Sequence, residues 1–276
     1  MTTEWLLDNG YFPELVIRKG IRIELKDRLN SIAGGSLEEA SSAKMALIDS
    51  LRSRPIAENV EIANKEHYEV DTMVFEHTLG KRMNRTQKEY IDAEAKRQGI
   101  MNLTIVTANV AVHEFDPASF DRVVSIEMFE HMKNYEKLMG KVNRWLKPLG
   151  KHFVHIFAHR EFPYECGSDG WMGQHFFNNG NMPSADLLLY FQRDLNIENQ
   201  WYVNGNHYAR TCEDWLKNLN KSKSLVLPSL AKTYGAGEEY KWFYRWQVFY
   251  LACAELFAWQ GGDTWGVYHY LFTKPV

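Results

Sequence analysis

The segment SFDRVVSIEMFEHMKNY, residues 119 to 135, constrains the fold more than any other part of the chain. Its first half contains a β-branched apolar run, residues 123–126, which is typical of a strand covered on both faces. Glu127, Glu130 and His131 follow this run directly. Ligands of open α/β sheets bind beyond the carboxyl ends of the strands, so three proton-handling groups at that place indicate chemistry.

The surrounding sequence predicts an α/β fold. The pattern indicates a helix over 87–98, strands over 102–109 and 119–126, a helix over 130–147 and a strand over 151–159. Alternation of this kind favours a parallel, doubly wound sheet. Further on, the sequence predicts a helix over 182–194, a strand over 196–205, a helix over 212–220 that Thr211 and Asp214 would cap, and a final strand over 264–274.

The chain divides by pattern into two expected domains. Residues 1–80 form a helical N-terminal cap, in which Ser36 and Glu39 make a capping-box pattern. Residues 81–276 form the core. A long stretch near residues 160–190 is rich in glycine, asparagine and aromatic residues without a clean period, which is typical of a lid or binding loop.

Composition excludes several classes of function. The net charge of −3 gives no indication of nucleic-acid binding. Three widely spaced cysteines indicate a reducing, cytoplasmic location, and no Cys/His spacing resembles a metal site. The apolar stretch 242–259 contains Arg245, Gln247 and Glu255, so we expect a buried or pocket-lining helix and no membrane span.

Five motifs in the right order carry a family resemblance from Asn84 to Val276. They are NRTQKEYI, SFDRVVSIEMFEHMKNY, GKHFVHIFAHREFPY, MPSADLLLYFQ and NHYARTCEDWL. The chain resembles the coclaurine N-methyltransferase family of plants, which belongs to a wider group with the cyclopropane fatty acid synthases. The resemblance implies S-adenosyl-L-methionine as cofactor and a small-molecule amine as substrate. It also leaves room for a homodimer.

The chain departs from that family between Met83 and Asn84. The family has several dozen residues there, including the first strand of the core and its D-x-G-C-G glycine loop. The glycine pairs of this chain, Gly34-Gly35, Gly170-x-x-Gly173 and Gly235-x-Gly237, do not follow an apolar strand and open a helix, as such a loop must. We therefore expect an incomplete Rossmann-like class I methyltransferase sheet with an N-terminal helical cap, and impaired catalysis.

Glu127, Glu130 and His131 are the candidate catalytic residues. If the segment after the strand is helical, Glu127 and His131 lie at i and i+4 on one face, with Glu130 beside them. A secondary amine is mostly protonated near neutral pH, so a carboxylate or an imidazole must take its proton before it can act as a nucleophile. The alternative is a solvated helix N-terminus, where the macrodipole favours acids.

The resemblance also implies cofactor contacts. Gln87 would lie on the ribose side, Asn109 and Val110 would flank the adenine, and Tyr68 matches a family tyrosine near the methyl-transfer centre. Simple capping and packing are the alternatives for residues of these types.

His155, Phe162, Trp171 and Phe243 are the candidate substrate-binding residues. His155 lies inside a predicted strand, where it is either a core histidine or the match of the histidine that helps to hold bicarbonate in cyclopropane synthases. The aromatic residues could line a pocket for a cationic amine through cation–π contacts. For Phe243, at helical spacing among other aromatics, core packing is the stronger alternative.

Three hypotheses remain open from the sequence. The first is an impaired S-adenosylmethionine-dependent N-methyltransferase of isoquinoline-type, coclaurine-like amines. The second is a lipid-modifying relative in which Glu127 and His155 hold bicarbonate beside an acyl chain. The third is a truncated product without catalysis.

Overall fold

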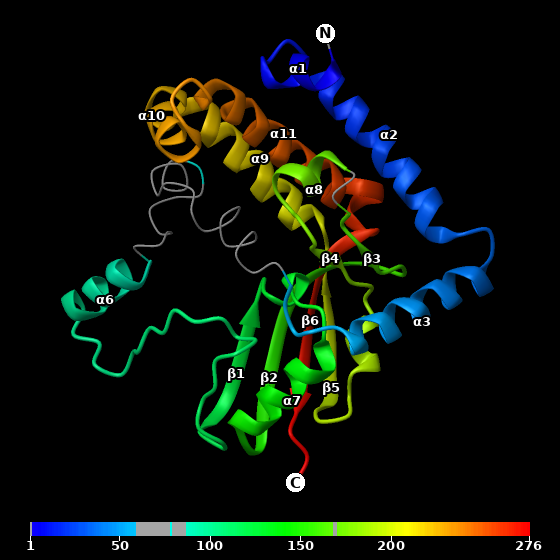
Figure 1. The fold of residues 1–276 in the computed structure, drawn as a ribbon, viewed down its shortest axis with the longest axis vertical. Helices are drawn as coiled ribbons and strands as arrows, with labels where there is room; N and C mark the ends of the chain where they lie inside the picture. Colours follow the sequence, from blue (N-terminus) through cyan, green and yellow to red (C-terminus); the bar gives the residue numbers. More distant parts are fainter. Residues whose placement is uncertain (1, 59–77, 79–86, 168–169) are drawn as a thin grey trace.

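A mixed four-stranded sheet forms the centre of the molecule (Figure 1). The computed structural model describes residues 2–58, 78, 87–167 and 170–276. The strand order in the sheet is β1-β2-β6-β5. The strands are β1 (Phe120–Ile126), β2 (Leu146–His159), β5 (Asn196–Val203) and β6 (Trp265–Thr273).

The directions of the strands correct the prediction of a parallel sheet. β1 and β2 run parallel, joined by the crossover helix α7 (Tyr135–Trp145), but β6 is antiparallel to both of its neighbours, β2 and β5. Ile126 pairs with His155 and His155 pairs with His269, so three strands align beside the end of β1. The predicted α/β class is confirmed, with few strands in the sheet.

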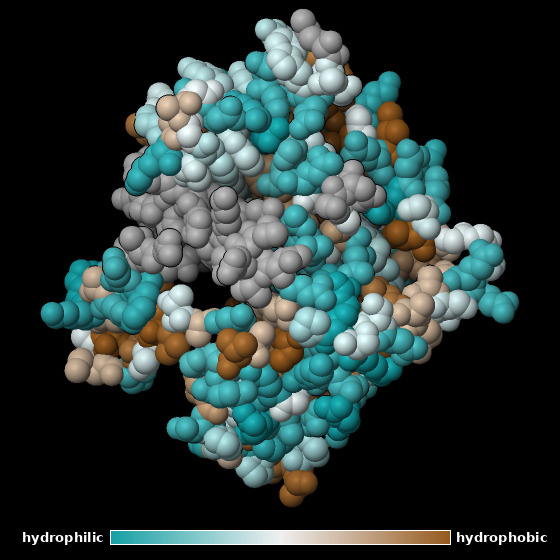
Figure 2. All heavy atoms as spheres, in the orientation of Figure 1, coloured by the Kyte–Doolittle hydropathy of each residue, from teal (hydrophilic) through white to brown (hydrophobic). Residues whose placement is uncertain are grey.

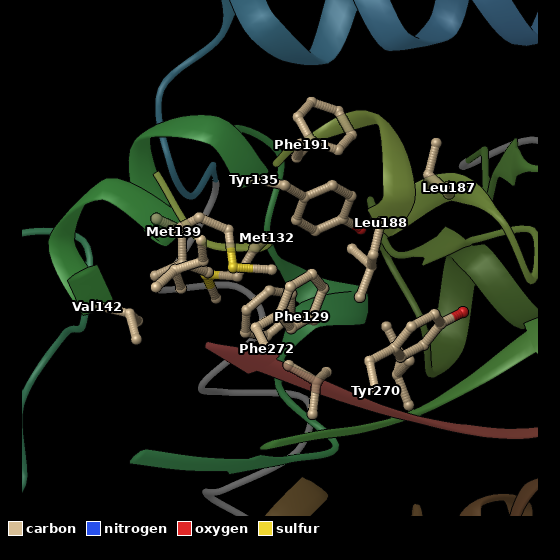
Figure 3. Close-up of a cluster of buried hydrophobic side chains, with 14 of the residues drawn as sticks. Phe129, Met132, Tyr135, Met139, Val142, Leu187, Leu188, Phe191, Tyr270 and Phe272 are labelled. Carbon is tan, nitrogen blue, oxygen red and sulfur yellow. The ribbon is translucent and has the colours of Figure 1, made fainter. Parts of the chain in front are cut away.

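Helix α7 covers one face of the sheet. Asn134 caps the helix, because its Oδ1 accepts a hydrogen bond of 2.9 Å from the backbone N–H of Lys137. One side of the helix is buried against the sheet and against the 3-10 turn η2 (Leu187–Tyr190), as Figure 3 shows. The predicted helix over 182–194 is therefore wrong, since only this short turn forms there. The cluster includes Phe129, Tyr135, Leu138, Met139, Val142, Leu188, Phe191, Tyr270 and Phe272.

The N-terminal segment is helical in its described part, as predicted. It comprises α1 (Thr3–Asp8), α2 (Glu14–Ala33) and α3 (Leu37–Ser53). Ser36 Oγ accepts from the backbone N–H of Glu39 at 3.2 Å, and the carboxylate of Glu39 accepts from the N–H of Gly35, so the N-terminus of α3 has side-chain caps of its own. The predicted domain boundary at residue 80 lies outside the described residues.

Three long helices near the C-terminus form a second layer with α1 and α2. They are α9 (Asn206–Lys221), α10 (Lys223–Tyr234) and α11 (Glu239–Ala258). Helix α9 begins at Asn206, so Thr211 lies inside it and the predicted cap at Thr211 is wrong. The Arg245 guanidinium, 7% exposed, binds the carboxylate of Asp8 at 2.7 Å, which ties α11 to α1.

Ion pairs also attach α2 to this layer. Arg18 lies 2.7 Å from Glu213 and 2.9 Å from Glu255, and Arg22 lies 2.6 Å from Glu255. Burial opposes the charge of Arg18, but its bonds to the carboxylates of Glu213, Glu255 and Glu14 outweigh this and raise its pKa. The N-terminal helices are therefore bound to the C-terminal helices, which the sequence pattern did not indicate.

The segment near residues 160–190 contains a small ribbon. It consists of β3 (Tyr164–Glu165) paired with β4 (Asn181–Met182), with the short helix α8 (Trp171–His175) between them. That this segment acts as a lid stays a prediction.

Helix α6 (Gln87–Arg97) lies to one side of the sheet, and a long irregular segment connects it to β1 (Figure 1). Gly99 ends the helix with a φ of 70°, as its position predicts. The predicted strand over 102–109 is wrong, because these residues form no regular structure. Within the described ranges, no helix is long and apolar enough to cross a membrane.

Candidate active site

The chain turns sharply at the end of β1. Glu127 has a φ of 49°, in the left-handed region that side chains rarely adopt. The next regular element is a 3-10 turn, η1 (Phe129–His131), and α7 starts only at Tyr135. Glu127 and His131 are therefore not at i and i+4 of one helix, and that expectation is wrong. A strained backbone of this kind is found mostly at functional sites.

The carboxylate of Glu127 meets side chains from β2 and α9, and a third side chain, from β6, lies behind the first. Its Oε1 lies 3.0 Å from His155 Nε2, at ion-pair distance, and its Oε2 accepts a hydrogen bond of 3.3 Å from the Tyr208 hydroxyl. His155 Nδ1 in turn lies 2.9 Å from His269 Nε2. Burial, followed by the charge of Glu127, raises the pKa of Tyr208, so the phenol remains a donor.

Glu130 and His131 occupy a drier position beside Glu127. Glu130 is 2% exposed, and its pKa is raised well above the ordinary value, first by burial and then by the charge of Glu127. His131 Nε2 lies 4.0 Å from Glu130 Oε1, and burial lowers the pKa of the imidazole although Glu127 opposes the shift. The site therefore holds one ionised acid beside an acid and an imidazole that both resist charge.

Sequence reasoning missed Tyr208 and His269 as parts of this site. Tyr208 stands in the motif NHYARTCEDWL, and His269 stands in the alternating final strand, so neither has a local signal of its own. Only the fold of α9 and the register of β6 bring them to Glu127 and His155.

The aromatic candidates lie in two different places. Phe162 lines a cleft of about 390 Å³ between α3 and the segment after β2, with Lys44 and Arg160. Trp171 begins α8 and packs beside the cluster of the C-terminal helices. Phe243 is 1% exposed inside that cluster, which matches the core alternative.

The candidate cofactor residues do not form a complete binding site for S-adenosylmethionine. Gln87 is the first residue of α6, and Tyr68 lies outside the described residues. The Asn109 Oδ1 accepts from the N–H of Ala111 at 2.9 Å, so this oxygen is used in a local turn, and Val110 packs against the sheet core. The three candidate glycine pairs lie at α2, α8 and α10, and none of them follows a strand of the central sheet.

The described residues therefore do not fit an S-adenosylmethionine molecule by themselves. In the same part of the chain, no group of three or more acids, histidines and cysteines could hold a metal ion.

A family model for mycolic acid cyclopropane synthetase matches residues 59–265. The chain belongs to this family. Among curated relatives, (S)-coclaurine N-methyltransferase of Thalictrum flavum subsp. glaucum is 35% identical over 196 residues, which cover 68% of this chain and 54% of that protein. Cyclopropane-fatty-acyl-phospholipid synthase of Escherichia coli (strain K12) is 30% identical over 151 residues, 54% of this chain and 37% of that enzyme. The chain spans about half the length of the coclaurine relatives that it matches.

Solved structures agree with this membership. A crystal structure of coclaurine N-methyltransferase bound to N-methylheliamine and SAH superposes with a TM-score of 0.88 at 26% identity, covering 98% of each chain. The cyclopropane synthase MmaA2 of Mycobacterium tuberculosis gives a TM-score of 0.53 at 18% identity, over 87% of this chain and 86% of that one, and shares the fold.

Proposed function

We propose that this member of the family is an S-adenosylmethionine-dependent N-methyltransferase of isoquinoline-type amines. The observation that carries the proposal is the convergence of Glu127, Glu130 and His131 at the carboxyl end of β1. The likeness to proteins named for coclaurine supports the amine class. When bound, S-adenosylmethionine would supply an electrophilic methyl group, and the acceptor nitrogen must be neutral to attack it.

Glu127 and His131 divide the work of deprotonation. Glu127 is the charged group of the site, held between His155 and Tyr208, so it attracts and orients the ammonium form of the substrate. Burial lowers the pKa of His131 and so favours its neutral form, and a neutral imidazole has a basic nitrogen that can accept the proton of the amine. Glu130 carries its own proton beside Glu127 and assists as a hydrogen-bond donor.

The lipid alternative has a specific observation in its favour. Glu127, His155 and Tyr208 present a carboxylate, an imidazole and a phenol around one point, and such groups could hold a small anion such as bicarbonate. The expected substrate would then be an unsaturated acyl chain in place of an amine.

A panel of secondary isoquinoline amines and a panel of unsaturated phospholipids, each with labelled S-adenosylmethionine, separate the two proposals. We expect label in the amines only. The rate should be slow, because the described residues form an incomplete cofactor site. Label in the phospholipids only would overturn the amine proposal.

Isothermal titration with S-adenosylmethionine tests the third hypothesis, a truncated product without catalysis. We expect a measurable heat with micromolar affinity. No binding by a protein with an intact melting transition would remove the enzymatic proposals together.

A further inference from the structure

Lys133 is a buried cation that the proposed chemistry does not use. The residue is 1% exposed, although lysine is almost never fully buried. Its Nζ donates to Asn181 Oδ1 at 2.6 Å and to Glu165 Oε1 at 2.6 Å, and both acceptors belong to the β3–β4 ribbon. A lysine two positions after His131 is therefore fixed to an element that is far away in the sequence.

The backbone around Lys133 is anchored from both sides. Its N–H donates to the Ile56 carbonyl at 2.7 Å, which joins the turn to the segment after α3. The preceding carbonyl, that of Met132, accepts from Asn181 Nδ2 at 2.5 Å. The turn with Glu130 and His131 is thus clamped between the N-terminal helices and the ribbon.

Arg54 completes the network. The Arg54 Nη1 donates to the same Glu165 Oε1 at 2.6 Å, so this oxygen bridges two cations. Burial opposes the charge of Glu165, but bonds to Lys133 and then to Arg54 outweigh it and lower the pKa of the carboxyl. The connection from α8 to β4 also contacts the turn, because the Phe177 ring lies 5.3 Å from the His131 ring.

An ionic network of this kind is a weak source of stability. Replacing a buried ion pair with apolar residues of similar volume is often neutral or stabilising, because desolvation offsets the attraction. The network contributes to the geometry instead. The bonds of Lys133 to Asn181 and Glu165 are both satisfied in one arrangement of the turn and the ribbon only.

We propose that Lys133 is a positioning residue, which locks the turn that carries Glu130 and His131 to the β3–β4 ribbon and so fixes the reactive geometry of that pair. This inference rests on the proposed function for its kinetic consequence but not for its structural one. A displacement of about 1 Å at a reacting group can cost on the order of 10²-fold in rate.

The test compares Lys133→Met with Lys147→Met. The first removes the ammonium and keeps most of the volume. The control removes a half-exposed lysine that pairs with Asp121 at 2.9 Å, at the start of β2, away from the site end of the sheet. Asn181→Ala is a second variant that cuts the bonds to Met132 and Lys133 and keeps the buried charge.

For the amine reaction, we expect Lys133→Met to lower kcat by ~10–100-fold with little change in KM. The acidic limb of the pH profile of kcat/KM should also move to higher pH. In the clamped turn, burial lowers the pKa of His131, and Glu127 and Glu130 face the ring among the titratable groups of the described residues. A loosened turn lets water reach the ring and raises that pKa. A loss of folded enzyme alone lowers the rate at every pH and does not move the acidic limb of the kcat/KM profile.

The same displacement is read without turnover by NMR titration of histidine-labelled protein, with the His131 signal assigned by its loss in His131→Gln. We expect the His131 titration to move to higher pH in Lys133→Met and Asn181→Ala, and to stay in place in Lys147→Met. If the wild type transfers no methyl group, the NMR titration alone tests the positioning role of Lys133. The positioning role and the proposed methyltransferase function can therefore fail separately.

An unmoved His131 titration in a Lys133→Met protein that still melts cooperatively would overturn the positioning role. If Lys133→Met shows no melting transition, the same result in Asn181→Ala would overturn it.

Discussion

The two flanks of β1 are built very differently. On the side of β2 and α7, Leu138, Met139 and Val154 are fully buried. On the other side, Val124 and Ile126 are 59% and 63% exposed. The segment between α6 and β1 adds further exposed apolar residues beside this flank, and Figure 2 shows hydrophobic residues gathered there. They include Met101, Leu103, Val106 and Val112.

The difference teaches that the described contacts hold the group around Glu127 together without the segment that carries the cofactor candidates. The contacts of Glu127, Glu130 and Lys133 that the structure shows go to the turn after β1, to the neighbouring strands, to α9, to the ribbon and, through the N–H of Lys133, to Ile56 after α3. In the segment before β1, where the cofactor candidates Gln87, Asn109 and Val110 lie, residues 101–106 include exposed apolar side chains. Val110 packs against the sheet core, and the Phe115 ring packs against Trp145 of α7. Three predictions test this contrast, in order of expected effect.

The largest effect is expected from Glu127→Gln. This change keeps the shape of the side chain and removes the charge that orients the amine, so kcat/KM for amine methylation should fall by ~10²–10³-fold. The matched control is Glu114→Gln in the segment before β1, where Glu114 binds Lys141 of α7 at 3.0 Å near the surface. Steady-state kinetics on both variants measure the contrast. Equal losses of kcat/KM in the two variants would contradict a specific role of Glu127 in amine methylation.

A smaller effect, on stability, is expected from a pair of leucine truncations. Leu138 is fully buried in α7, and Leu103 is 45% exposed in the segment before β1. Leu138→Ala should lower the free energy of unfolding by about 2–4 kcal/mol, because it leaves a cavity in the sheet core. Leu103→Ala should change it by less than about 0.5 kcal/mol. Urea unfolding followed by circular dichroism gives both values, and a large cost at Leu103 would show that this flank is packed in solution.

The same contrast explains how far the sequence could predict the fold. The strands β1, β2, β5 and β6 and the helix α11 were expected, since each carries its own local pattern. Residues 102–109 carry the same β-branched pattern and form no strand. Backbone donors and acceptors must find a partner strand, and residue pattern alone does not supply one.

The site was predictable to a similar degree. Glu127, Glu130, His131 and His155 do lie together, because three of them follow β1 and the fourth is in register with Ile126 on β2. The partners of these residues were not predictable, because Tyr208 and His269 are far from them in the sequence and contact them only in the folded chain. The helix expected over residues 127–131 failed because Glu127 adopts a left-handed backbone that no sequence pattern marks.

The smallest effect concerns the covered face of the sheet at low pH. His152 is 0% exposed on β2, its Nδ1 lies 3.1 Å from the Val123 carbonyl, and burial lowers its pKa from 6.5 to about 4. Between these values the unfolded chain binds a proton that the folded chain does not, so stability falls as the pH drops. The loss should reach about 2–3 kcal/mol near pH 4.

His152→Phe should make the free energy of unfolding less dependent on pH between 6.5 and 4. It should also lower stability at neutral pH by about 1–3 kcal/mol, because the Val123 carbonyl loses its donor. His269, on the face of the sheet opposite to α7, is the comparison. Its pKa is also lowered by burial and then by His155, but the residue is half-buried, so His269→Phe should change the slope less. Urea titrations at a series of pH values measure both slopes. An equal change from the two variants would mean that both faces of the sheet exclude water alike.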